Sequence, residues 1–544
     1  MPISAFVLLA GLATVPAVPD ARAAGQAHGT ATVSGQVYLE RDGHPGRTAD
    51  EPGLAGVAVS NGRDIARTDA RDCYRISAMP GQAVFVVKPA GYRFMPGTGG
   101  LPDFWTRVVA PGPMQADFAL LAAGGPDDGP GDGARDAFEV LLFADTQVKS
   151  ARDIDYYRRD IVEPLQGRHA ASFGITLGDL VDDAVALYPA LNAVTLQLGV
   201  PWFHVPGNHD VDPGARDDGM SLAHWEAVYG PDTYAVEEGA ATFVFLDDVV
   251  VKADGDYAGG LREDQFLFLE RYLAQVPRDR LLVLGMHVPL FDGGRRGFRA
   301  DDRARLFALL RDRPRVLVLS GHSHTQQHYW HGVQDGWEGR APLHEYNVGA
   351  ACGAFWSGAP DAAGIPDATM SDGTPNGHAT LSVRGDGGYA LAYHPARVAD
   401  GDSSFTTAMA LHAPRVLRRG AYPAWGVYAN VFMGDAATRV EYRIDGGEWT
   451  PMRRVERADP RLLAENAADD LAPALRGYDR SPEATASTHL WRGALATGLD
   501  PGEHRIEVRA FDRWQGEAMA STSYVLQEMP ADRGAGYVPA GPVP

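Results

Sequence analysis

Five short apolar runs, each followed at once by polar residues able to bind metals, constrain this chain most strongly. They read FEVLLFADTQ, FGITLGDLVDD, PWFHVPGNHD, RLLVLGMHVP and RVLVLSGHSH, and all fall between residues 138 and 325. Continuous apolar runs bounded by turn residues are typical of strands buried on both faces. Open α/β sheets gather functional side chains beyond the carboxyl ends of such strands. We therefore expect one site that draws on Asp145, Gln147, Asp179, Asn208, His209, His287, His322 and His324.

Composition sets broad limits on the chain's organisation and partners. A length of 544 residues predicts roughly three or four domains, and 45% hydrophobic with 22% charged residues is typical of a folded protein. The formal net charge of −21 argues against nucleic acid as a partner, because that binding depends on clustered Lys and Arg. Of the two cysteines, Cys73 and Cys352 fall in different predicted domains, so no disulfide framework is expected.

The amino-terminal segment predicts export. An apolar stretch from Ala5 to Val18 is followed by the cleavage-like triplet Ala-Arg-Ala, which resembles a signal peptide over residues 1–24. The positively charged start of such peptides is missing here, since no Lys or Arg precedes Arg22. We expect a periplasmic, envelope or secreted protein, and no other stretch is long and apolar enough to span a membrane.

Two predicted β domains flank the five-run region. Residues 30–122 alternate in the manner of strands, and their order resembles prealbumin-like or carboxypeptidase-regulatory-like modules, with Asp72 where a turn glycine is usual. A Gly/Pro/Asp-rich linker occupies 123–136 and the central domain 137–397. Strands return over 410–528, where Asp-Gly at Asp445 predicts a hairpin in a second β-sandwich. Residues 529–544 are expected to form a disordered tail.

The five blocks together resemble the calcineurin-like metallophosphoesterases. That family carries D-x-H, GDxxD, GNH followed by an acid, a histidine before a small residue or proline, and GHxH; this chain has DTQ, GDLVD, GNHD, HVP and GHSH in the same order. The resemblance implies a two-sheet α/β sandwich with helices on its outer faces. It also implies a hydrolase that cleaves phosphate mono- or diesters by attack of a hydroxide bridging two divalent metal ions.

The resemblance also assigns metal ligands and raises one question of metal identity. The first metal would take Asp145, Gln147, Asp179 and His324, and the second Asp179, Asn208, His287 and His322. Gln147 stands where the family usually has histidine. Because an amide oxygen suits harder ions, Mn²⁺ or Mg²⁺ gains plausibility there, with Fe and Zn still open.

Further roles follow from the same motifs. By family analogy His209 is the general acid, oriented by Asp182 or Asp210, although Asp182 and Asp183 are equally consistent with solvated loop acids. Phe355, Trp356 and Asn376, in CGAFWSG and DGTPNGH, are expected to form one wall of the substrate pocket, with packing roles for the two aromatic residues as the alternative.

Two other functional readings stay open. One is a catalytically silent surface-binding protein whose β modules contact envelope or glycan. The other is a nuclease on the same core, which the acidic balance of the chain disfavours.

Overall fold

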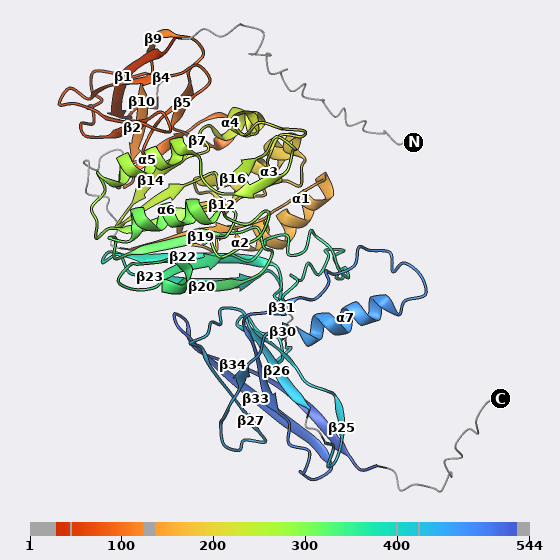
Figure 1. Cartoon of the computed structure of the whole chain (residues 1–544). Coiled ribbons are helices and arrows are strands. Elements are labelled where there is room, and N and C mark those ends of the chain that lie inside the picture. The colour runs from red at the N-terminus through yellow and green to blue at the C-terminus, as the bar shows by residue number, and fades with distance from the viewer. Residues whose placement is uncertain (1–28, 44–45, 125–136, 399–400, 423–424, 530–544) are drawn as a thin grey trace, which may run out of the picture.

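Three units follow one another along the molecule in chain order (Figure 1). The computed structural model describes residues 29–43, 46–124, 137–398, 401–422 and 425–529. The predicted signal peptide lies outside these residues, as do nearly all of the predicted linker and tail. In the described part of the chain, no helix is long and apolar enough to cross a membrane.

The N-terminal unit is built from two β-sheets. One has the order β4-β1-β10-β6-β7, with β9 added against β1, and the other has the order β3-β2-β5-β8. Asp72 ends the turn that leads into β4, with φ of 60°, the left-handed conformation that its place in the turn predicts. The strands are β1 (Ala31–Leu39), β2 (Ala58–Ser60), β3 (Ile65–Arg67), β4 (Cys73–Ala78), β5 (Ala83–Val86), β6 (Tyr92–Pro96), β7 (Pro102–Asp103), β8 (Trp105–Arg107), β9 (Gly112–Gln115) and β10 (Phe118–Ala122).

The central unit packs two sheets face to face. The first has the order β13-β12-β11-β22-β23, in which the first three strands are parallel. Its strands are β11 (Ala137–Phe143), β12 (Ala171–Leu177), β13 (Trp202–Val205), β22 (Gly377–Arg384) and β23 (Tyr389–Pro395). β11 and β12 are almost wholly buried, as continuous apolar runs require.

The second sheet of the central unit has the order β14-β15-β18-β19-β21-β20, with parallel pairing from β15 through β21. Its strands are β14 (Tyr234–Glu238), β15 (Ala241–Phe245), β18 (Leu281–Gly285), β19 (Val316–Ser320), β20 (Gln327–His331) and β21 (Leu343–Asn347). A separate hairpin joins β16 (Val249–Val251) to β17 (Tyr257–Gly259).

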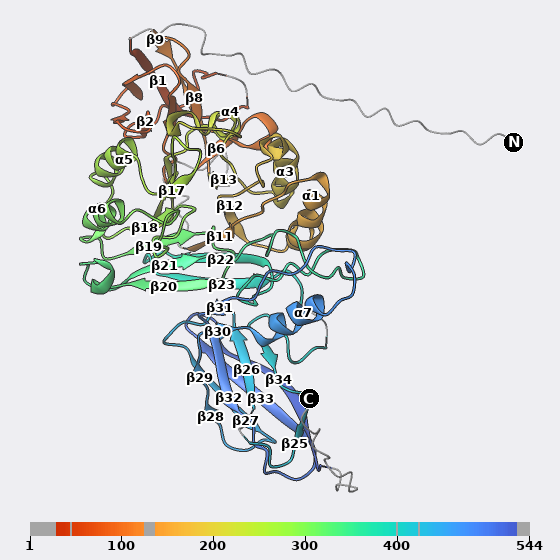
Figure 2. The ribbon, with the colours of Figure 1, turned by 45° about the vertical axis from the view of Figure 1, so that its right-hand side comes forward.

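Helices lie outside the two central sheets (Figures 1 and 2). α5 carries acids in its first turn, and α6 does the same, which suits the positive end of the helix dipole. Together with the sheets they confirm the predicted two-sheet α/β core. The helices are α1 (Ala151–Tyr157), α2 (Glu163–Leu165), α3 (Tyr188–Thr195), α4 (Ala223–Tyr229), α5 (Glu263–Leu273) and α6 (Ala300–Leu310), with a π-helical turn at Arg158–Val162 between α1 and α2.

The C-terminal unit is a β-sandwich with an inserted helix. Its sheets have the orders β24-β26-β32-β29 and β25-β34-β33-β27-β28. Asp445 and Gly446 both have positive φ and connect β27 to β28, so the predicted hairpin is confirmed. The elements are β24 (Met409–His412), β25 (Val416–Arg418), β26 (Gly426–Val431), β27 (Arg439–Ile444), β28 (Thr450–Pro451), β29 (Arg453–Arg454), β30 (Arg457–Ala458), α7 (Pro460–Asp470), β31 (Ala486–Ser487), β32 (Leu490–Ala494), β33 (Gly502–Asp512) and β34 (Gly516–Gln527).

The N-terminal unit is joined to the central unit more closely than the C-terminal unit is. One cluster of buried apolar side chains runs through the first two units, whereas the C-terminal sandwich has a core of its own. A buried ion pair adds to the first junction: Lys88 Nζ lies 2.7 Å from Glu238 Oε2, with both side chains less than a tenth exposed. At the second junction, Asp372 accepts hydrogen bonds from Gln326 N (2.8 Å) and His489 Nε2 (3.1 Å).

Candidate metal centre

The site lies where parallel strands of both central sheets end. Asp145 and Gln147 follow β11, Asp179 follows β12, and Asn208 follows β13. From the second sheet, His287 follows β18, while His322 and His324 follow β19. The two sheets thus contribute to one edge of the sandwich, as the apolar runs predict.

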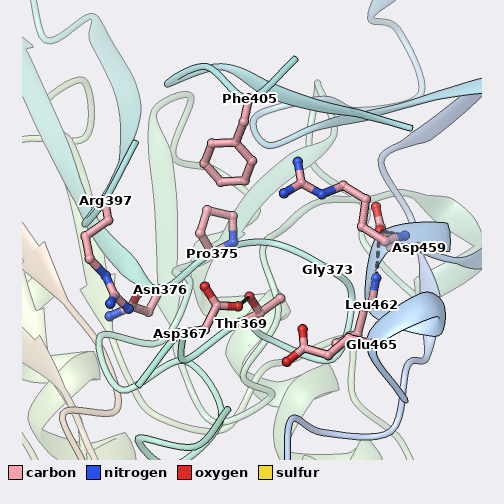
Figure 3. Close-up of a pocket in the computed structure, with 11 residues that line it drawn as sticks. Asp367, Thr369, Gly373, Pro375, Asn376, Arg397, Phe405, Asp459, Leu462 and Glu465 are labelled. Carbon is pink, nitrogen blue, oxygen red and sulfur yellow. Dashed lines mark hydrogen bonds between the residues drawn. The ribbon is translucent and has the colours of Figure 1, made fainter. Parts of the chain in front are cut away.

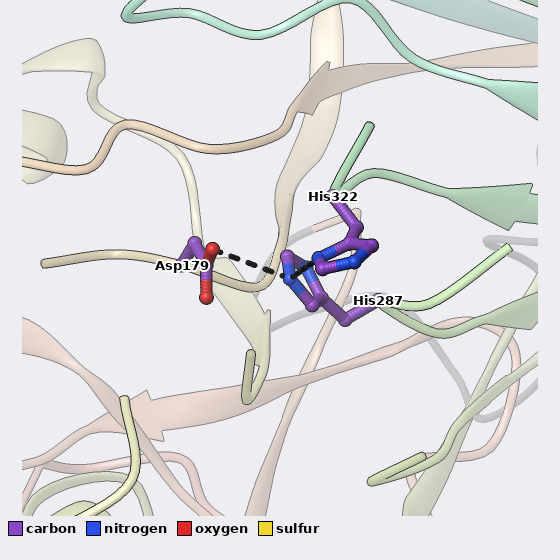
Figure 4. Close-up of side chains that lie close together, drawn as sticks. All are labelled: Asp179, His287 and His322. Atoms are coloured by element: carbon purple, nitrogen blue, oxygen red, sulfur yellow. Dashed lines mark hydrogen bonds and ion pairs between the residues drawn. The ribbon is translucent and has the colours of Figure 1, made fainter. Parts of the chain in front are cut away.

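Three candidate ligand atoms surround the Nε2 atom of His287. Its Nε2 lies 3.3 Å from Asp179 Oδ2, 3.2 Å from Asn208 Oδ1 and 3.2 Å from His322 Nδ1. Figure 4 shows the rings of His287 and His322 beside the Asp179 carboxylate. Asp179, His287 and His322 each offer one ligand atom, and these atoms all lie within 4.8 Å of one another, which is close enough for one ion to contact all three.

A second group of candidate ligands lies beside Asp179 and Asp145. His324 Nε2 is 3.5 Å from Asp145 Oδ1, and Gln147 Nε2 is 3.4 Å from Asp179 Oδ2. The same Asp179 oxygen therefore faces both His287 and Gln147. Asp179 is the residue placed to be shared between two ions.

Second hydrogen bonds orient two of the imidazole rings. His287 Nδ1 lies 2.9 Å from the carbonyl oxygen of Leu177, and His324 Nδ1 lies 2.7 Å from that of Gly353. A neutral imidazole that donates from Nδ1 presents the lone pair of Nε2, and in both rings Nε2 faces the centre. These are the contacts expected of histidines that bind a metal.

The electrostatics of the centre favour a cation. Burial disfavours a charged imidazolium at His287, yet the Asp179 carboxylate outweighs burial and raises the His287 pKa to about 10. Burial lowers the pKa of His322 to about 4, and repulsion from His287 adds to that shift. The rise at His287 reflects the negative charge of the Asp179 carboxylate, which favours positive charge at this place; a bound metal ion would supply that charge and leave both rings as neutral donors. Carboxylate, amide and imidazole donors fit Mn²⁺, Mg²⁺, Fe or Zn.

Most of the candidate ligands have a left-handed backbone conformation that residues other than glycine rarely adopt. Five of the seven have positive φ: Asp145 (49°), Gln147 (42°), Asp179 (49°), His322 (69°) and His324 (48°). Such conformations cost on the order of 1–3 kcal/mol each and cluster at functional sites. Neighbouring loops hold them in place: Gln147 N donates to the Asp179 carbonyl (2.9 Å), and His322 N to the Asp145 carboxylate (3.0 Å).

Three family models match this chain in order. They are described as the N terminal of calcineurin-like phosphoesterase (residues 43–123), calcineurin-like phosphoesterase (138–326) and the C terminal of calcineurin-like phosphoesterase (345–517). The chain belongs to the calcineurin-like phosphoesterases. Membership makes it a phosphoester hydrolase, and the two flanking β units correspond to the N- and C-terminal matches.

Individual proteins are more distantly similar. A probable glycerophosphodiester phosphodiesterase of Arcobacter nitrofigilis is 26% identical over 199 residues, which cover 34% of this chain and 71% of the relative. A probable cyclic nucleotide phosphodiesterase of Rhodopseudomonas palustris is 30% identical over 175 residues, covering 30% of this chain and 60% of the relative.

Solved structures show more remote likenesses. Yellow lupin purple acid phosphatase PPD1 has a TM-score of 0.37 at 14% identity and covers 64% of this chain and 66% of its own. GAP50 of the Plasmodium inner membrane complex has a TM-score of 0.31 at 12% identity and covers 48% of this chain and 86% of its own.

Buried carboxylates behind the phosphoesterase ligands fix the loops that carry them. Asp210 accepts hydrogen bonds from Leu180 N (3.1 Å), Gly207 N (2.9 Å) and Tyr188 Oη (3.1 Å). Asp210 therefore braces the Asp179 and Asn208 loops, whereas sequence reasoning considered it as a partner for His209.

Two further carboxylates hold the histidine loops. Asp248 accepts from His287 N (2.9 Å). Glu345 accepts from Leu290 N (2.8 Å) and Ser320 Oγ (3.0 Å) and pairs with His331 Nε2 at 2.7 Å. Sequence reasoning missed both acids, and their position at or just after a buried strand was the only available signal.

His209 lies at the open side of the centre with two acids beside its ring. Nδ1 is 3.0 Å from Asp183 Oδ1 and 3.3 Å from Asp182 Oδ1. The backbone N–H of His209 donates to Asp179 Oδ1 at 2.8 Å, which ties the residue to the shared carboxylate. The side chain of His209 is 30% exposed. Asp183 is thus a closer partner than the predicted Asp182.

The three predicted substrate residues occupy different surroundings. Phe355 is 47% exposed and stacks on the His324 ring with centroids 4.7 Å apart. Trp356 is buried and donates from Nε1 to the Thr146 carbonyl at 3.0 Å, so it supports the Asp145–Gln147 loop from behind. Phe355 is the one placed at the rim.

Asn376 is buried and already bonded. Its amide donates to Asp160 Oδ2 (2.8 Å) and to the Ala351 carbonyl (3.0 Å). It also borders a cavity of about 160 Å³ between the central unit and α7, where Arg397, Phe405 and Arg461 form part of the wall (Figure 3). The residues lining this cavity include none of the candidate ligands. A substrate contact by Asn376 stays a prediction.

Proposed function

We propose that this protein is an exported, metal-dependent phosphodiesterase that also accepts phosphate monoesters. The convergence of Asp179, Asn208, His287 and His322 donors is the observation that carries the proposal. The preference for diesters draws on the two relatives, both of which are named as probable phosphodiesterases. Export draws on the apolar segment over residues 1–24.

Seven side chains would hold two divalent ions. Asp145, Gln147 and His324 would hold one, Asn208, His287 and His322 the other, and Asp179 would join both. Ions bound in such a pair lower the pKa of a water molecule and neutralise charge on the phosphoryl oxygens. The amide of Gln147 favours Mn²⁺ or Mg²⁺ at the first position.

The chain's own residues then position the ester and move the proton. His209 donates a proton from Nε2 to the leaving alkoxide, while Asp183 and Asp182 hold Nδ1. The rigid link from His209 N to Asp179 keeps the ring at a fixed place beside the centre. Phe355, exposed on top of His324, offers a face on which an apolar leaving group can pack.

The test is hydrolysis by metal-stripped, full-length protein to which Mn²⁺, Mg²⁺, Fe²⁺ or Zn²⁺ is added back singly. Bis(p-nitrophenyl) phosphate and p-nitrophenyl phosphate serve as diester and monoester. We expect turnover only after metal addition, faster on the diester, with Mn²⁺ among the best ions. Faster hydrolysis of the monoester would show a preference for monoesters over diesters. If no metal restored hydrolysis of either ester, the proposal would be overturned.

Asp179→Asn is the matched loss-of-function variant, because it keeps the shape of the shared ligand and removes its charge. We expect it to abolish turnover and to lower bound metal as measured by elemental analysis. Asp217→Asn, on an exposed nearby loop, should behave as the unmodified protein does. Export is tested separately by fractionating a bacterial expression host and sequencing the mature amino terminus, where cleavage near residue 24 is expected.

A further inference from the structure

The β16–β17 hairpin and the loop that packs on it lie beside His322. Gly259 N donates to the Arg296 carbonyl at 3.0 Å, and Gly259 also forms a bridge with Phe298. Lys252 Nζ donates to the Tyr257 carbonyl at 2.7 Å, which links the turn of the hairpin to the start of β17. Hairpin and loop therefore form one connected piece of backbone, and they hold Tyr257 and Arg296 side by side.

Tyr257 faces the centre. Its ring lies edge-on to His322, with centroids 6.2 Å apart and an interplanar angle of 84°. The pKa of an ordinary tyrosine is about 10, so near neutral pH the hydroxyl keeps its hydrogen and is able to donate it.

Arg296 backs the Tyr257 ring. Its guanidinium carbon is 5.1 Å from the ring centroid, and Nε donates to Asp256 Oδ1 at 2.8 Å. The side chain is 64% exposed to solvent. In a chain of net charge −21, a cation held beside the ligand histidines provides local attraction for an anion.

We propose that the Tyr257 hydroxyl donates a hydrogen bond to a non-bridging oxygen of the substrate's phosphoryl group, and that Arg296 is the positioning residue that holds the phenol and adds positive charge. This edge recognises the phosphate anion itself, whether it belongs to an ester or to the inorganic product. The inference rests on the proposed function and extends it to the recognition of substrate.

Arg295 supplies a matched control for Arg296. It also pairs with Asp256, at 2.8 Å through NH2, and carries the same charge, but its side chain is 76% exposed and the cation over the Tyr257 ring is that of Arg296. A substitution at Arg295 therefore removes the same charge and one of the ion pairs to Asp256 while leaving the cation beside the phenol in place.

The experiment uses metal-loaded, full-length protein and compares Tyr257→Phe, Arg296→Gln and Arg295→Gln. We expect Tyr257→Phe to lower kcat/KM for the diester about tenfold or more, the usual cost of a lost hydrogen bond to a charged group, with KM rising. The inhibition constant of inorganic phosphate should rise by a similar factor. Arg296→Gln should shift both quantities several-fold, and Arg295→Gln less than twofold.

Two results would overturn the inference. One is a Tyr257→Phe protein that matches the unmodified protein in both KM and phosphate inhibition. The other is loss of bound metal in Tyr257→Phe, which would mean that the hydroxyl supports the metal centre and not the phosphate. If the unmodified protein hydrolyses neither ester, calorimetric titration of the metal-loaded forms with inorganic phosphate still decides: equal affinity in all variants rejects the contact, and weaker binding by Tyr257→Phe supports it.

Discussion

At the scale of single residues, His209 separates proton transfer from metal binding. We expect His209→Ala to lower kcat by about 10²–10⁴, the usual contribution of general acid catalysis, while bound metal stays near two ions. The reason is positional: the ring contacts Asp182 and Asp183, and only its backbone N–H reaches Asp179. Stopped-flow or steady-state kinetics together with elemental analysis measure both quantities.

The leaving group provides the control for that variant. An ester with a good leaving group such as p-nitrophenolate needs little protonation, so the loss should be larger for an alkyl phosphodiester than for the nitrophenyl ester. Equal losses on both, or a protein without metal, would contradict the assignment.

A substitution at Cys352 tests how the side-chain amide of Gln147 is oriented. As placed, the Gln147 amide nitrogen faces Asp179 (3.4 Å) and Oε1 faces Cys352 Sγ (3.8 Å). To bind an ion, the amide has to turn its oxygen inward, and the Cys352 sulfur then accepts from the nitrogen. We expect Cys352→Ala to weaken Mn²⁺ binding at least several-fold, as loss of a supporting contact does. Fluorescence-monitored metal titration measures it, with Cys73→Ala in the N-terminal unit as the control that should not change.

The sequence predicted the candidate metal ligands better than it predicted the residues that hold the ligand loops in place. Ligand positions followed from buried strands, because the carboxyl ends of parallel strands meet at one edge. The left-handed backbone conformation of Asp145 and His324 could not be predicted from the sequence, since neither residue type requires it. Asp248 and Glu345 resemble ordinary acids in sequence, and only the folded chain shows that backbone N–H groups surround them.

At the scale of elements, glycines permit the close approach of the ligand loops. A Cβ on Gly207 would lie 2.2 Å from Asp179 Oδ1 and 2.3 Å from Asp179 N, distances that no side chain tolerates. We therefore expect Gly207→Ala to displace Asp179 and to cost most of the bound metal and activity while the circular dichroism spectrum stays unchanged. Gly219→Ala, where the nearest atom is 3.4 Å away, is the control. Full metal content in Gly207→Ala would refute this reason for the glycine.

The sequence-based prediction missed one helix, although the sequence contains a recognisable helix start there. Residues 410–528 were expected to be all β, yet α7 spans Pro460–Asp470. Asp459 caps that helix by accepting from Arg461 N (2.7 Å), and Pro460 occupies its first position, which is a common helix start. The alternating strands on both sides outweighed this short signal. Boundaries of the flanking β units were easier, because turn residues separate their strands.

At the scale of the whole molecule, buried neutral histidines predict loss of stability in acid. Burial lowers the pKa of His204, His328 and His378 to about 3, against about 6.5 in an unfolded chain. Between pH 6.5 and 3 the unfolded state binds more protons, so the free energy of unfolding falls as pH falls, by about 1.4 kcal/mol per pH unit for each such residue. Above pH 6.5 these residues contribute no pH dependence.

Urea unfolding in the presence of EDTA, at pH 7.5 and 5.0, measures that slope without metal effects. His204 is the sharpest test, because neither of its ring nitrogens has a hydrogen-bond partner within the described residues. His204→Leu should reduce the pH dependence, whereas His224→Leu, at a side chain 57% exposed, should leave it unchanged. An unaltered slope in His204→Leu would show that other groups govern acid unfolding.

The origin of the ligands in two separate sheets links stability to the cell's supply of ions. Asp145, Asp179 and Asn208 follow strands of one sheet, and His287 and His322 follow strands of the other, so a bound ion cross-links the two layers. By mass action, each tenfold rise in free ion above the dissociation constant adds about 1.4 kcal/mol to the folded state. Where divalent ions run short, this protein would lose its resistance to proteases as well as its activity, so its abundance would report on metal supply.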